Sequence, residues 1–356
     1  MRTLLRSVGT AAGLDRIGFA SVAPFEDVEA DIRRRKDEGL SNRLAFTYAD
    51  PKGATDLRRH FPWAESLVVA ARSYKPSAQT PDRGGRVAAA ARWPGYAPLR
   101  AGLTAVKKTL VDQGHQAEVL CDDNRLVDRA AAVRAGIGWW GKNTMVLAPG
   151  LGPWFLLGSV VTSLWIEPDP PMERGCGSCS ACLPACPTGA LVAPGILDAR
   201  LCLAAWAQTG GVVPVELRVP MGQRLYGCDD CLDACPPGRP LHILGEDDGL
   251  SFDLRWVLWA SDWTLLEHFG HWFLPDRDPR IIRRNALIAA GNSGDREMTS
   301  VVGPYASHPD WLLRTHALWA LGQLGGAEAK LLLDQRAQVE TDSRVLQELG
   351  RVPIGK

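Results

Sequence analysis

Hydrophobic positions in the first half of the chain follow two different periods. The run SLVVAARSY, residues 66–74, is short, apolar and partly β-branched, which is typical of a buried strand. Apolar residues recur at helical spacing in two other places, at Leu103, Val106, Leu110 and Val111 and again at Val127, Ala131 and Ala135. The pattern predicts a mixed domain of helices and strands over residues 1–167.

The chain carries no charge between Lys142 and Glu167, a stretch long enough to suggest a membrane helix. Prolines and glycines interrupt this stretch, however, and leave two short apolar runs at residues 144–148 and 154–165. Two buried strands joined by a turn are therefore expected instead of a membrane span. The N-terminus has scattered charges and no apolar core of a signal peptide. We expect a soluble, cytoplasmic protein with no membrane association.

The last third of the chain is predicted to be helical and contains an internal repeat. RRNALIAAGNSG, residues 283–294, aligns with RTHALWALGQLG, residues 314–325, at an offset of 31 residues. A repeat of this length with alanine and leucine packing positions fits a HEAT-like helical pair. Two ordinary helices of similar sequence are the alternative. This part forms the third predicted domain, residues 243–356.

Composition limits the possible partners. The chain has 356 residues, of which 46% are hydrophobic, so it can hold two or three domains with a sizeable core. Lysine plus arginine equals aspartate plus glutamate at 40 each, so binding of a nucleic acid would need a local basic patch. The candidate patches are residues 33–36, residues 58–59, and Arg277, Arg280, Arg283 and Arg284. A solvated helix face is the simpler interpretation of each.

Eight of the nine cysteines lie between Cys176 and Cys235, within a second predicted domain over residues 168–242. The run CGSCSACLPACP has the spacing of bacterial ferredoxins, in which three cysteines hold one cubane cluster and the fourth holds a second cluster. CDDCLDACP, residues 228–236, is a shorter copy with three cysteines, and Cys202 can supply the ligand that it lacks. The eight cysteines are the number of ligands that two [4Fe–4S] clusters need.

Crossing the fourth ligands gives one set of cysteines for each cluster. Cluster one takes Cys176, Cys179, Cys182 and Cys235, and cluster two takes Cys186, Cys202, Cys228 and Cys231. A zinc ribbon has no use for the third cysteine of each run, and a disulfide scaffold suits short secreted chains. The ninth cysteine, Cys121, is expected to be a buried core thiol.

The stretch AGIGWWGKNT, residues 135–144, contains both the G-x-G-x-x-G of a dinucleotide-binding turn and most of a P-loop. Both nucleotide motifs follow a strand and begin a helix. Here the preceding residues are helical in pattern, a strand-like segment follows, and Asn143 replaces the Ser or Thr of a P-loop. Nucleotide binding is therefore disfavoured. The glycines beside Trp139 and Trp140 suit a backbone packed against a large flat ligand, or a tight turn with core tryptophans.

Several motifs together resemble the epoxyqueuosine reductase family, relatives of the reductive dehalogenases, along nearly the whole chain. They are VDRAAAVRAGIGWWGKNT (residues 127–144), CGSCSACLPACPTGAL (176–191), LDARLC (197–202), YGCDDCLDACP (226–236) and RRNALIAAGNSGD (283–295). The resemblance implies an α+β protein. Its parts are an N-terminal α/β cobalamin-binding domain, a ferredoxin-like two-cluster domain and a C-terminal HEAT-like domain.

The resemblance also implies an activity and its cofactors. The family reduces the epoxide of epoxyqueuosine in a tRNA anticodon to the alkene of queuosine, using cobalamin and two [4Fe–4S] clusters. A monomer and an external electron donor are expected. The absence of a D-x-H-x-x-G corrinoid motif agrees with a family that places no histidine under the cobalt. The residues implied to line the corrinoid are Arg129, Gly136, Gly138, Trp139, Gly141, Lys142 and Asn143.

Opening an epoxide leaves an alkoxide, which needs a proton as it forms. By its position in the motif, Asp128 is the first candidate for the acid, with Asp122 and Asp123 in reserve. The alternatives for Asp128 are a helix N-cap or a salt bridge to Arg129.

The chain departs from the family pattern in three places: Ala91–Pro98, Ala204–Thr209 and Pro237–Gly238. All three lie where the surroundings of the substrate or the cofactors are expected. Two alternative functions therefore stay open. One is a related corrinoid iron–sulfur reductase that acts on another modified nucleoside or a small organic molecule. The other is a non-catalytic electron carrier.

Overall fold

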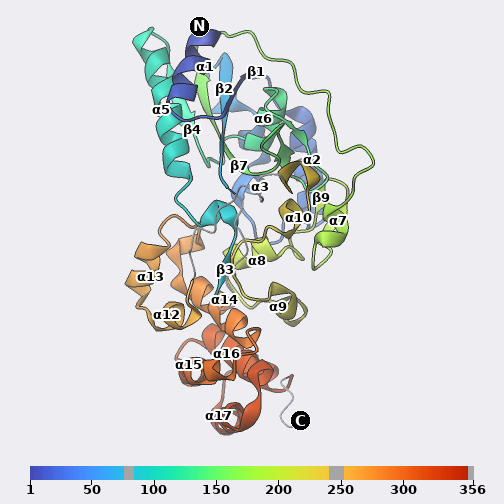
Figure 1. The fold of residues 1–356 in the computed structure, drawn as a ribbon, viewed down its shortest axis with the longest axis vertical. Coiled ribbons are helices and arrows are strands. Elements are labelled where there is room, and N and C mark those ends of the chain that lie inside the picture. The colour runs from blue at the N-terminus through green and yellow to red at the C-terminus, as the bar shows by residue number, and fades with distance from the viewer. Residues whose placement is uncertain (76–83, 240–251, 352–356) are drawn as a thin grey trace. The chain divides into compact units, whose positions relative to one another are not determined.

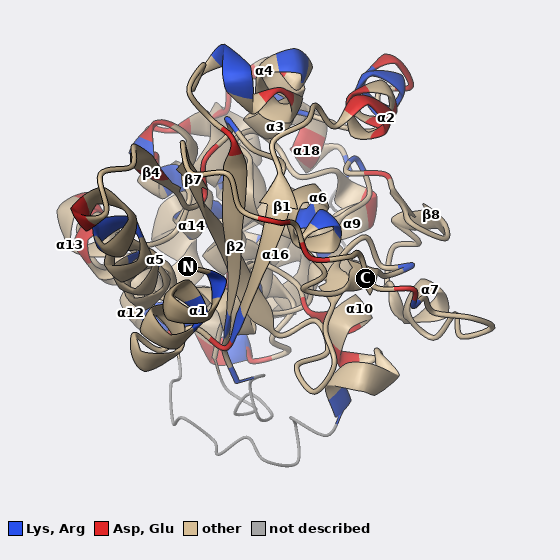
Figure 2. Cartoon of the chain, turned by 90° about the horizontal axis from the view of Figure 1, so that it is seen from above, with Lys and Arg blue, Asp and Glu red and all other residues tan. Residues whose placement is uncertain are grey.

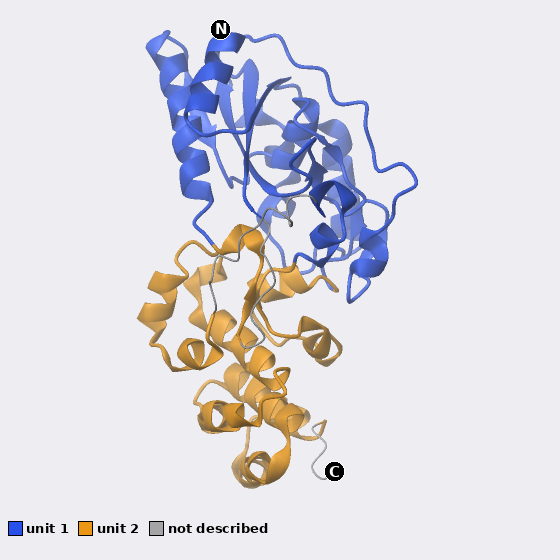
Figure 3. Ribbon diagram, in the orientation of Figure 1, with its two compact units in different colours: residues 1–76, 93–200, 229–246 blue, residues 77–92, 201–228, 247–356 orange. Residues whose placement is uncertain are grey.

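The computed structural model describes residues 1–75, 84–239 and 252–351 (Figure 1). The chain divides into two compact units (Figure 3). The first contains residues 1–76, 93–200 and 229–246, and the second contains residues 77–92, 201–228 and 247–356. The predicted cysteine-rich segment, residues 168–242, is thus divided between both units. The boundary expected at residues 242–243 lies outside the described residues.

A four-stranded sheet forms the centre of the first unit, with the strand order β1-β2-β7-β4. The strands are β1 (Arg16–Ser21), β2 (Ser66–Ser73), β7 (Phe155–Thr162) and β4 (Ala117–Leu120). All neighbouring strands are antiparallel, and Val68 of β2 lies opposite Phe19 of β1 and Val160 of β7. The two apolar runs predicted as strands are β7 and the short β6 (Val146–Leu147). β6 pairs with β5 (Trp139–Trp140), however, so the two runs do not form one hairpin.

Helices cover both faces of this sheet (Figure 1). α5 (Tyr96–Asp112) packs on β7 and β4, and α1 (Arg2–Ala11) packs on α5. α6 (Asp128–Arg134) packs on the opposite face, in a core with Leu67, Val69 and Val161. Because both faces are covered, β2 is apolar along most of its length rather than alternating, as the sequence predicts. The first unit also contains α2 (Glu26–Asp37), α3 (Phe46–Ala49), α4 (Pro51–Thr55), α7 (Cys182–Ala185), β8 (Leu191–Ala193), β9 (Ile196–Leu197) and α10 (Asp230–Asp233).

The second unit is mainly helical and contains the predicted repeat. α14 (Pro279–Gly291) packs against α16 (Trp311–Leu324), and these helices carry the two aligned segments. A short parallel pair, β3 (Arg86–Val87) and β10 (Arg224–Tyr226), lies in the same unit. The other helices are α8 (Leu203–Gln208), α9 (Val215–Met221), α12 (Leu254–Trp259), α13 (Asp262–His268), α15 (Thr299–Val302), α17 (Gly326–Val339) and α18 (Ser343–Leu349). The α+β class is therefore confirmed. Among the described residues no helix combines the length and apolarity needed to cross a membrane.

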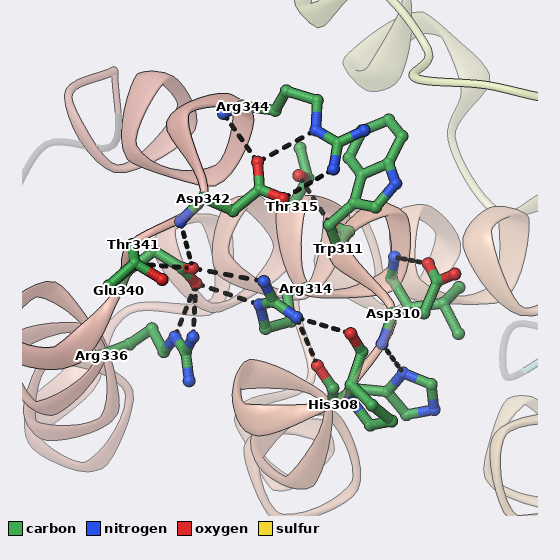
Figure 4. A network of polar contacts seen from close by, with 12 residues as sticks. His308, Asp310, Trp311, Arg314, Thr315, Arg336, Glu340, Thr341, Asp342 and Arg344 are labelled. Atoms are coloured by element: carbon green, nitrogen blue, oxygen red, sulfur yellow. Dashed lines mark hydrogen bonds and ion pairs between the residues drawn. The ribbon is translucent and has the colours of Figure 1, made fainter.

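Ion pairs fix the end of the repeat region (Figure 4). Glu340 accepts hydrogen bonds from Arg314 of α16 at 3.0 Å and from Arg336 of α17 at 2.7 Å. Burial alone raises the pKa of Glu340, but these two arginines and backbone amides lower it to about 2. Glu340 is thus a carboxylate at neutral pH that holds two helices together.

The basic candidate patches are largely satisfied within the protein. On α2, Arg33 pairs with Glu29 and Arg34 with Asp31, and acidic and basic residues are mixed along the helix (Figure 2). The solvated helix face is therefore the correct interpretation of residues 33–36. The proposed patch at residues 277–284 is wrong for two of its arginines, because Arg283 is 8% exposed and Arg284 is fully buried.

Candidate active site

Four cysteines of the first unit line one cavity. Cys176, Cys179 and Cys182 come from the first run and Cys235 from the second, and the cavity has a volume of about 260 Å³. Its other walls are mostly apolar and come from Trp139, Leu147, Pro236 and Pro237, together with Lys142, Asn143 and Gly175. These are the four cysteines assigned to cluster one from spacing alone. Their placement around one apolar cavity fits a bound cluster.

The four thiols interact with one another electrostatically. Burial, and then the charges of Cys176, Cys182 and Cys179, raises the pKa of Cys235 to about 11. The four cysteines form no disulfide. Among the described residues, no three side chains of His, Cys, Asp or Glu converge closely enough to hold a single metal ion. The thiols line the walls of the cavity instead.

The second set of cysteines is shared between the units. Cys186 and Cys231 belong to the first unit, and Cys202 and Cys228 to the second. The backbone amide of Ala190 donates to Cys186 Sγ at 3.2 Å. Although burial raises the pKa of Cys186, hydrogen bonds from Thr188 and Ala190 lower it below its usual range, which favours the thiolate that a metal needs. The assignment of this set to cluster two stays a prediction.

Buried side chains of the repeat hold the segment that carries Cys202 and Cys228. The Asn285 amide donates to the carbonyls of Ala207 at 2.9 Å and Leu225 at 2.8 Å. Ala207 lies on α8, which begins directly after Cys202, and Leu225 lies on β10, three residues before Cys228. The neighbouring Arg284 donates to the carbonyls of Trp206 and Thr209. These contacts explain why two polar residues lie on a buried helix.

The second copy of the repeat also binds backbone atoms through a buried polar side chain at the corresponding position. His316 aligns with Asn285 at the offset of 31 residues, and its Nε2 accepts a hydrogen bond from the amide of Val213 at 3.2 Å. Burial lowers the pKa of His316, so the imidazole is neutral and can accept this bond. The repeat therefore has an inner polar position that binds the backbone of residues 201–228.

We expect Asn285→Ala to destabilise the protein by about 2–4 kcal/mol, because it leaves two buried carbonyls without a donor. Denaturant unfolding of the iron-loaded protein measures the loss. Iron content should also fall, since the substitution loosens the flanks of Cys202 and Cys228. Gln323→Ala, an exposed amide on α16, is the matched control and should change stability by less than about 0.5 kcal/mol. Equal midpoints for the two variants would contradict the prediction.

The glycine-rich stretch joins a helix to a hairpin, as its pattern predicts. Gly136 ends α6 with a positive φ of 66°, and the amides of Gly136 and Ile137 close the helix by donating to Val133 and Ala132. A Cβ at Gly138 would lie 2.1 Å from the carbonyl oxygen of Leu147 on the paired strand. Packing within the protein thus accounts for these two glycines, and the nucleotide-loop geometry is absent from this described segment. Contact of the loop with a corrinoid stays a prediction.

The loop after β5 reaches both cysteine runs. The amide of Lys142 donates to Cys176 Sγ at 3.4 Å, and its ammonium donates to the carbonyl of Gly177 at 2.8 Å. The amide side chain of Asn143 donates to the carbonyl of Cys231 at 3.4 Å. Trp139 is buried against Cys235, whereas Trp140 is 44% exposed. Lys142 and Asn143 therefore connect the two runs around the cluster-one cavity.

One departure from the family pattern has a local packing reason. Pro237 lines the cavity, and Gly238 packs against the turn before β7, where its Cβ would lie 2.5 Å from Trp154 Nε1. The turn is equally tight from the other side, since a Cβ at Gly152 would lie 2.5 Å from Gly238 Cα. The backbone of Gly238, after Pro237, therefore packs closely against Gly152 in the turn before β7.

Asp128 is the first residue of α6, and its environment is that of an acid. Its Oδ1 is buried without a hydrogen-bond partner. Burial, and then the charge of Asp122, raises the pKa of Asp128 well above its usual range. Val127, not Asp128, occupies the N-cap position, so the N-cap alternative is wrong; the charge of the exposed Arg129 lowers the pKa of Asp128, but by less than burial raises it. A buried carboxyl that keeps its proton at neutral pH is typical of a general acid.

The two reserve candidates differ from each other. Asp123 forms an ion pair with Arg125 at 2.6 Å, and hydrogen bonds from Arg125 lower the pKa of Asp123. Burial raises the pKa of Asp122. Asp122 therefore remains a possible acid, whereas Asp123 is a structural carboxylate. Cys121 is buried as expected, and burial raises the pKa of its thiol to about 11.

Sequence reasoning missed Tyr96, which interacts with Asp128, and Tyr74, which interacts with Tyr96. Although Tyr96 is 37% exposed, partial burial, and then the charges of Asp122 and Asp128, raises the pKa of its phenol. Burial likewise raises the pKa of Tyr74, which is close enough to Tyr96 for their charges to interact. Both phenols therefore stay protonated and can donate hydrogen bonds. Tyr96 lies within Ala91–Pro98, where the departure from the family pattern was the available signal.

Comparison with known proteins agrees with this arrangement. Residues 175–238 match the model of a 4Fe-4S double cluster binding domain, and residues 268–351 match a model of HEAT repeats. The chain is 32% identical over 355 residues to the epoxyqueuosine reductase of Bacillus cereus, covering 95% of this chain and 93% of that one. The helical repeat and the two-cluster segment are thereby confirmed.

Two solved structures are similar over nearly the whole chain. One is an epoxyqueuosine reductase with a tRNA-Tyr stem loop that carries epoxyqueuosine (TM-score 0.90, 29% identity, covering 98% of this chain and 97% of that one). The other is the Bacillus subtilis enzyme, with an aspartate-bearing catalytic loop swung out of its active site (TM-score 0.90, 29% identity, covering 100% and 99%). Full-length similarity in sequence and fold, together with the cysteine-lined cavity and the buried acid, places this chain in the epoxyqueuosine reductase family.

Proposed function

We propose that this protein reduces the epoxide of epoxyqueuosine in a tRNA anticodon to the alkene of queuosine. Both epoxide C–O bonds break, two electrons and two protons enter, and water leaves. The observation that carries the proposal is the Asp128 carboxyl, whose Oδ1 is buried without a hydrogen-bond partner and whose pKa is raised. It lies in a chain that is 32% identical to an epoxyqueuosine reductase over 355 residues. A relative of the same fold has been solved with epoxyqueuosine-modified tRNA.

Two [4Fe–4S] clusters supply the electrons in this proposal. Cys176, Cys179, Cys182 and Cys235 hold cluster one, and Cys186, Cys202, Cys228 and Cys231 hold cluster two. The cavity shared by the first four cysteines supports the first assignment. The ferredoxin spacing and the match to a double-cluster model support the second. An external donor reduces the clusters, and the protein acts as a monomer.

Cobalamin is the proposed cofactor of the first unit. When bound, it supplies a cobalt centre that passes electrons to the substrate. The structure offers an observation that fits a buried polar ligand near α6, namely the partnerless Oδ1 of Asp128. Tyr96 lies close enough to Asp128 to interact with it electrostatically, Tyr74 interacts with Tyr96 in the same way, and both hydroxyls can add hydrogen bonds. The residues proposed to contact the corrinoid are Arg129, Gly136, Gly138, Trp139, Gly141, Lys142 and Asn143.

Asp128 acts as the acid that protonates the oxygen of the opening epoxide. Burial keeps its proton in place at neutral pH, where an ordinary carboxyl would have lost it. After donation, the carboxylate must regain a proton before the next turnover. The neighbouring carboxyl of Asp122, whose pKa is also raised, can relay that proton.

A direct assay tests the function. The protein is reconstituted anaerobically with iron, sulfide and cobalamin, reduced, and incubated with tRNA that carries epoxyqueuosine. We expect nucleoside mass spectrometry to show conversion to queuosine. Loss of activity when cobalamin is omitted is the matched control. Intact epoxyqueuosine after incubation with protein that holds both clusters and cobalamin would contradict the proposal and favour a different substrate.

A further inference from the structure

Lys142 is the one charged residue among the described residues that line the cluster-one cavity. We propose that Lys142 sets the reduction potential of cluster one. This role differs from the corrinoid contact implied by the family motif, because the contacts of Lys142 in the structure point to the cysteine run. The inference rests on the assignment of cluster one in the proposed function, but not on the identity of the substrate.

The first line of support is the backbone of Lys142. Its amide donates to Cys176 Sγ at 3.4 Å. Amide hydrogen bonds to the sulfurs of an iron–sulfur cluster stabilise the reduced, more negative form and so raise the potential. The carbonyl of Lys142 accepts a hydrogen bond from the amide of Gly195 at 2.8 Å. The backbone of Lys142 is therefore held by hydrogen bonds at both its amide and its carbonyl.

The second line of support is the position of the ammonium group. It donates to the carbonyl of Gly177 at 2.8 Å, directly after the first cysteine ligand. Gly177 has a positive φ of 52°, a conformation that glycine adopts without strain. The positive charge is thus tethered to the turn that wraps the cluster, whereas most lysines extend into solvent.

The surroundings make this charge effective. Trp139, Leu147, Pro236 and Pro237 are apolar walls of the same cavity and strengthen the interaction of the charge with the cluster. The Lys142–Gly177 hydrogen bond is exposed, however, so solvent screens the charge in part. Other cations are near but differently placed. Arg174 lies over the ring of Trp139 at 5.1 Å, and the Arg239 side chain donates to the carbonyl of Ala234. Each electron added to the cluster adds negative charge, which Lys142 stabilises.

The test is a potentiometric titration of the reconstituted protein followed by electron paramagnetic resonance. We expect Lys142→Met to shift the potential of one cluster to more negative values. The reduction equilibrium should change several-fold to about tenfold, which corresponds to at most about 59 mV. Lys142→Arg keeps the charge and should stay near the wild-type value. Lys108→Met, an exposed lysine on α5 that pairs with Asp112, is the matched control and should not shift it.

The outcomes separate this inference from its alternatives. An unchanged potential in Lys142→Met with full iron content overturns the inference, and weaker cobalamin binding in the same variant would then assign Lys142 to the corrinoid. If Lys142→Met loses iron, Lys142→Gln keeps a donor for Gly177 without the charge, and an unshifted potential in that variant overturns the inference equally. Failure of the wild-type protein to reduce epoxyqueuosine would refute the proposed function and leave the potentials unaffected.

Discussion

Asp128→Asn should lower the rate of epoxide reduction by about 10²- to 10⁴-fold, the usual contribution of a positioned general acid. The side chains are nearly equal in size, so the fold and both clusters should be retained. The physical reason is that the substitution removes the acidic proton of the Asp128 carboxyl. Burial holds it on Asp128 at neutral pH, and an amide cannot deliver one to the alkoxide. Single-turnover assays with epoxyqueuosine-containing tRNA measure the loss, with iron and cobalamin content as checks.

Asp122→Asn is the informative comparison, because burial raises the pKa of this carboxyl too. We expect a smaller loss for Asp122→Asn than for Asp128→Asn. Full activity in Asp128→Asn together with a large loss in Asp122→Asn would transfer the role of the acid to Asp122. Full activity in both variants would exclude both Asp128 and Asp122 as the acid.

Asp128→Asn, which should lower activity, should raise the stability of the folded protein relative to wild type as the pH rises. The pKa of Asp128 is raised in the folded protein, so its contribution to stability is greatest below the unfolded pKa of about 3.9 and is lost as pH rises through the folded pKa. Asp128→Asn removes this pH-dependent loss. The melting temperature of the variant relative to wild type should therefore increase between about pH 5 and pH 8. A constant difference across this range would mean that Asp128 has an ordinary pKa.

Cys235→Ser should abolish turnover and remove one cluster. Cys235 is 7% exposed and lines the cavity with Cys176, Cys179 and Cys182, although it comes from the other cysteine run. Loss of one thiolate opens a corner of the cubane, and electrons no longer reach the first unit. The iron content should fall from about eight to about four per chain for two clusters. Iron analysis and electron paramagnetic resonance of the reconstituted protein test this.

Cys121→Ala is the matched control, because Cys121 is also buried but lies outside both cysteine runs. It should keep all of its iron, with only the small loss of stability that a truncated core side chain brings. Cys228→Ser should remove the other cluster and leave the signal of cluster one. Retention of both clusters in Cys235→Ser would refute the crossed assignment of ligands.

Much of the candidate site could be predicted from the sequence because its signals are local. Three proposed ligands of cluster one lie within seven residues, so the spacing of Cys176, Cys179 and Cys182 indicates the chemistry directly. The order of helix and strand around Gly136 was equally readable from the sequence and disfavoured a nucleotide loop, and α6 and β5 confirm that order. The repeat at residues 283–294 and 314–325 was visible as a fixed offset.

Other properties depend on partners that are distant in sequence. The arginines at residues 277–284 looked like a basic surface, but Arg284 is buried on carbonyls more than 70 residues away. The motif implied a corrinoid contact for Lys142, which stays a prediction, and the structure adds hydrogen bonds from Lys142 to Cys176 and Gly177. No spacing rule predicts such contacts, because they depend on how separate segments pack.

The sequence by itself determined the cluster type, the repeat and the family of this protein, since these depend on short-range covalent spacing and on similarity along the chain. Only the tertiary structure decided how the environments of the three candidate carboxyls differ. The motif ranks Asp128 before Asp122 and Asp123, but the letters give no pKa. Folding buries one oxygen of Asp128 without a partner and gives Asp123 a guanidinium. Desolvation and ion pairing shift the pKa values of these carboxyls in opposite directions, and both are properties of packing.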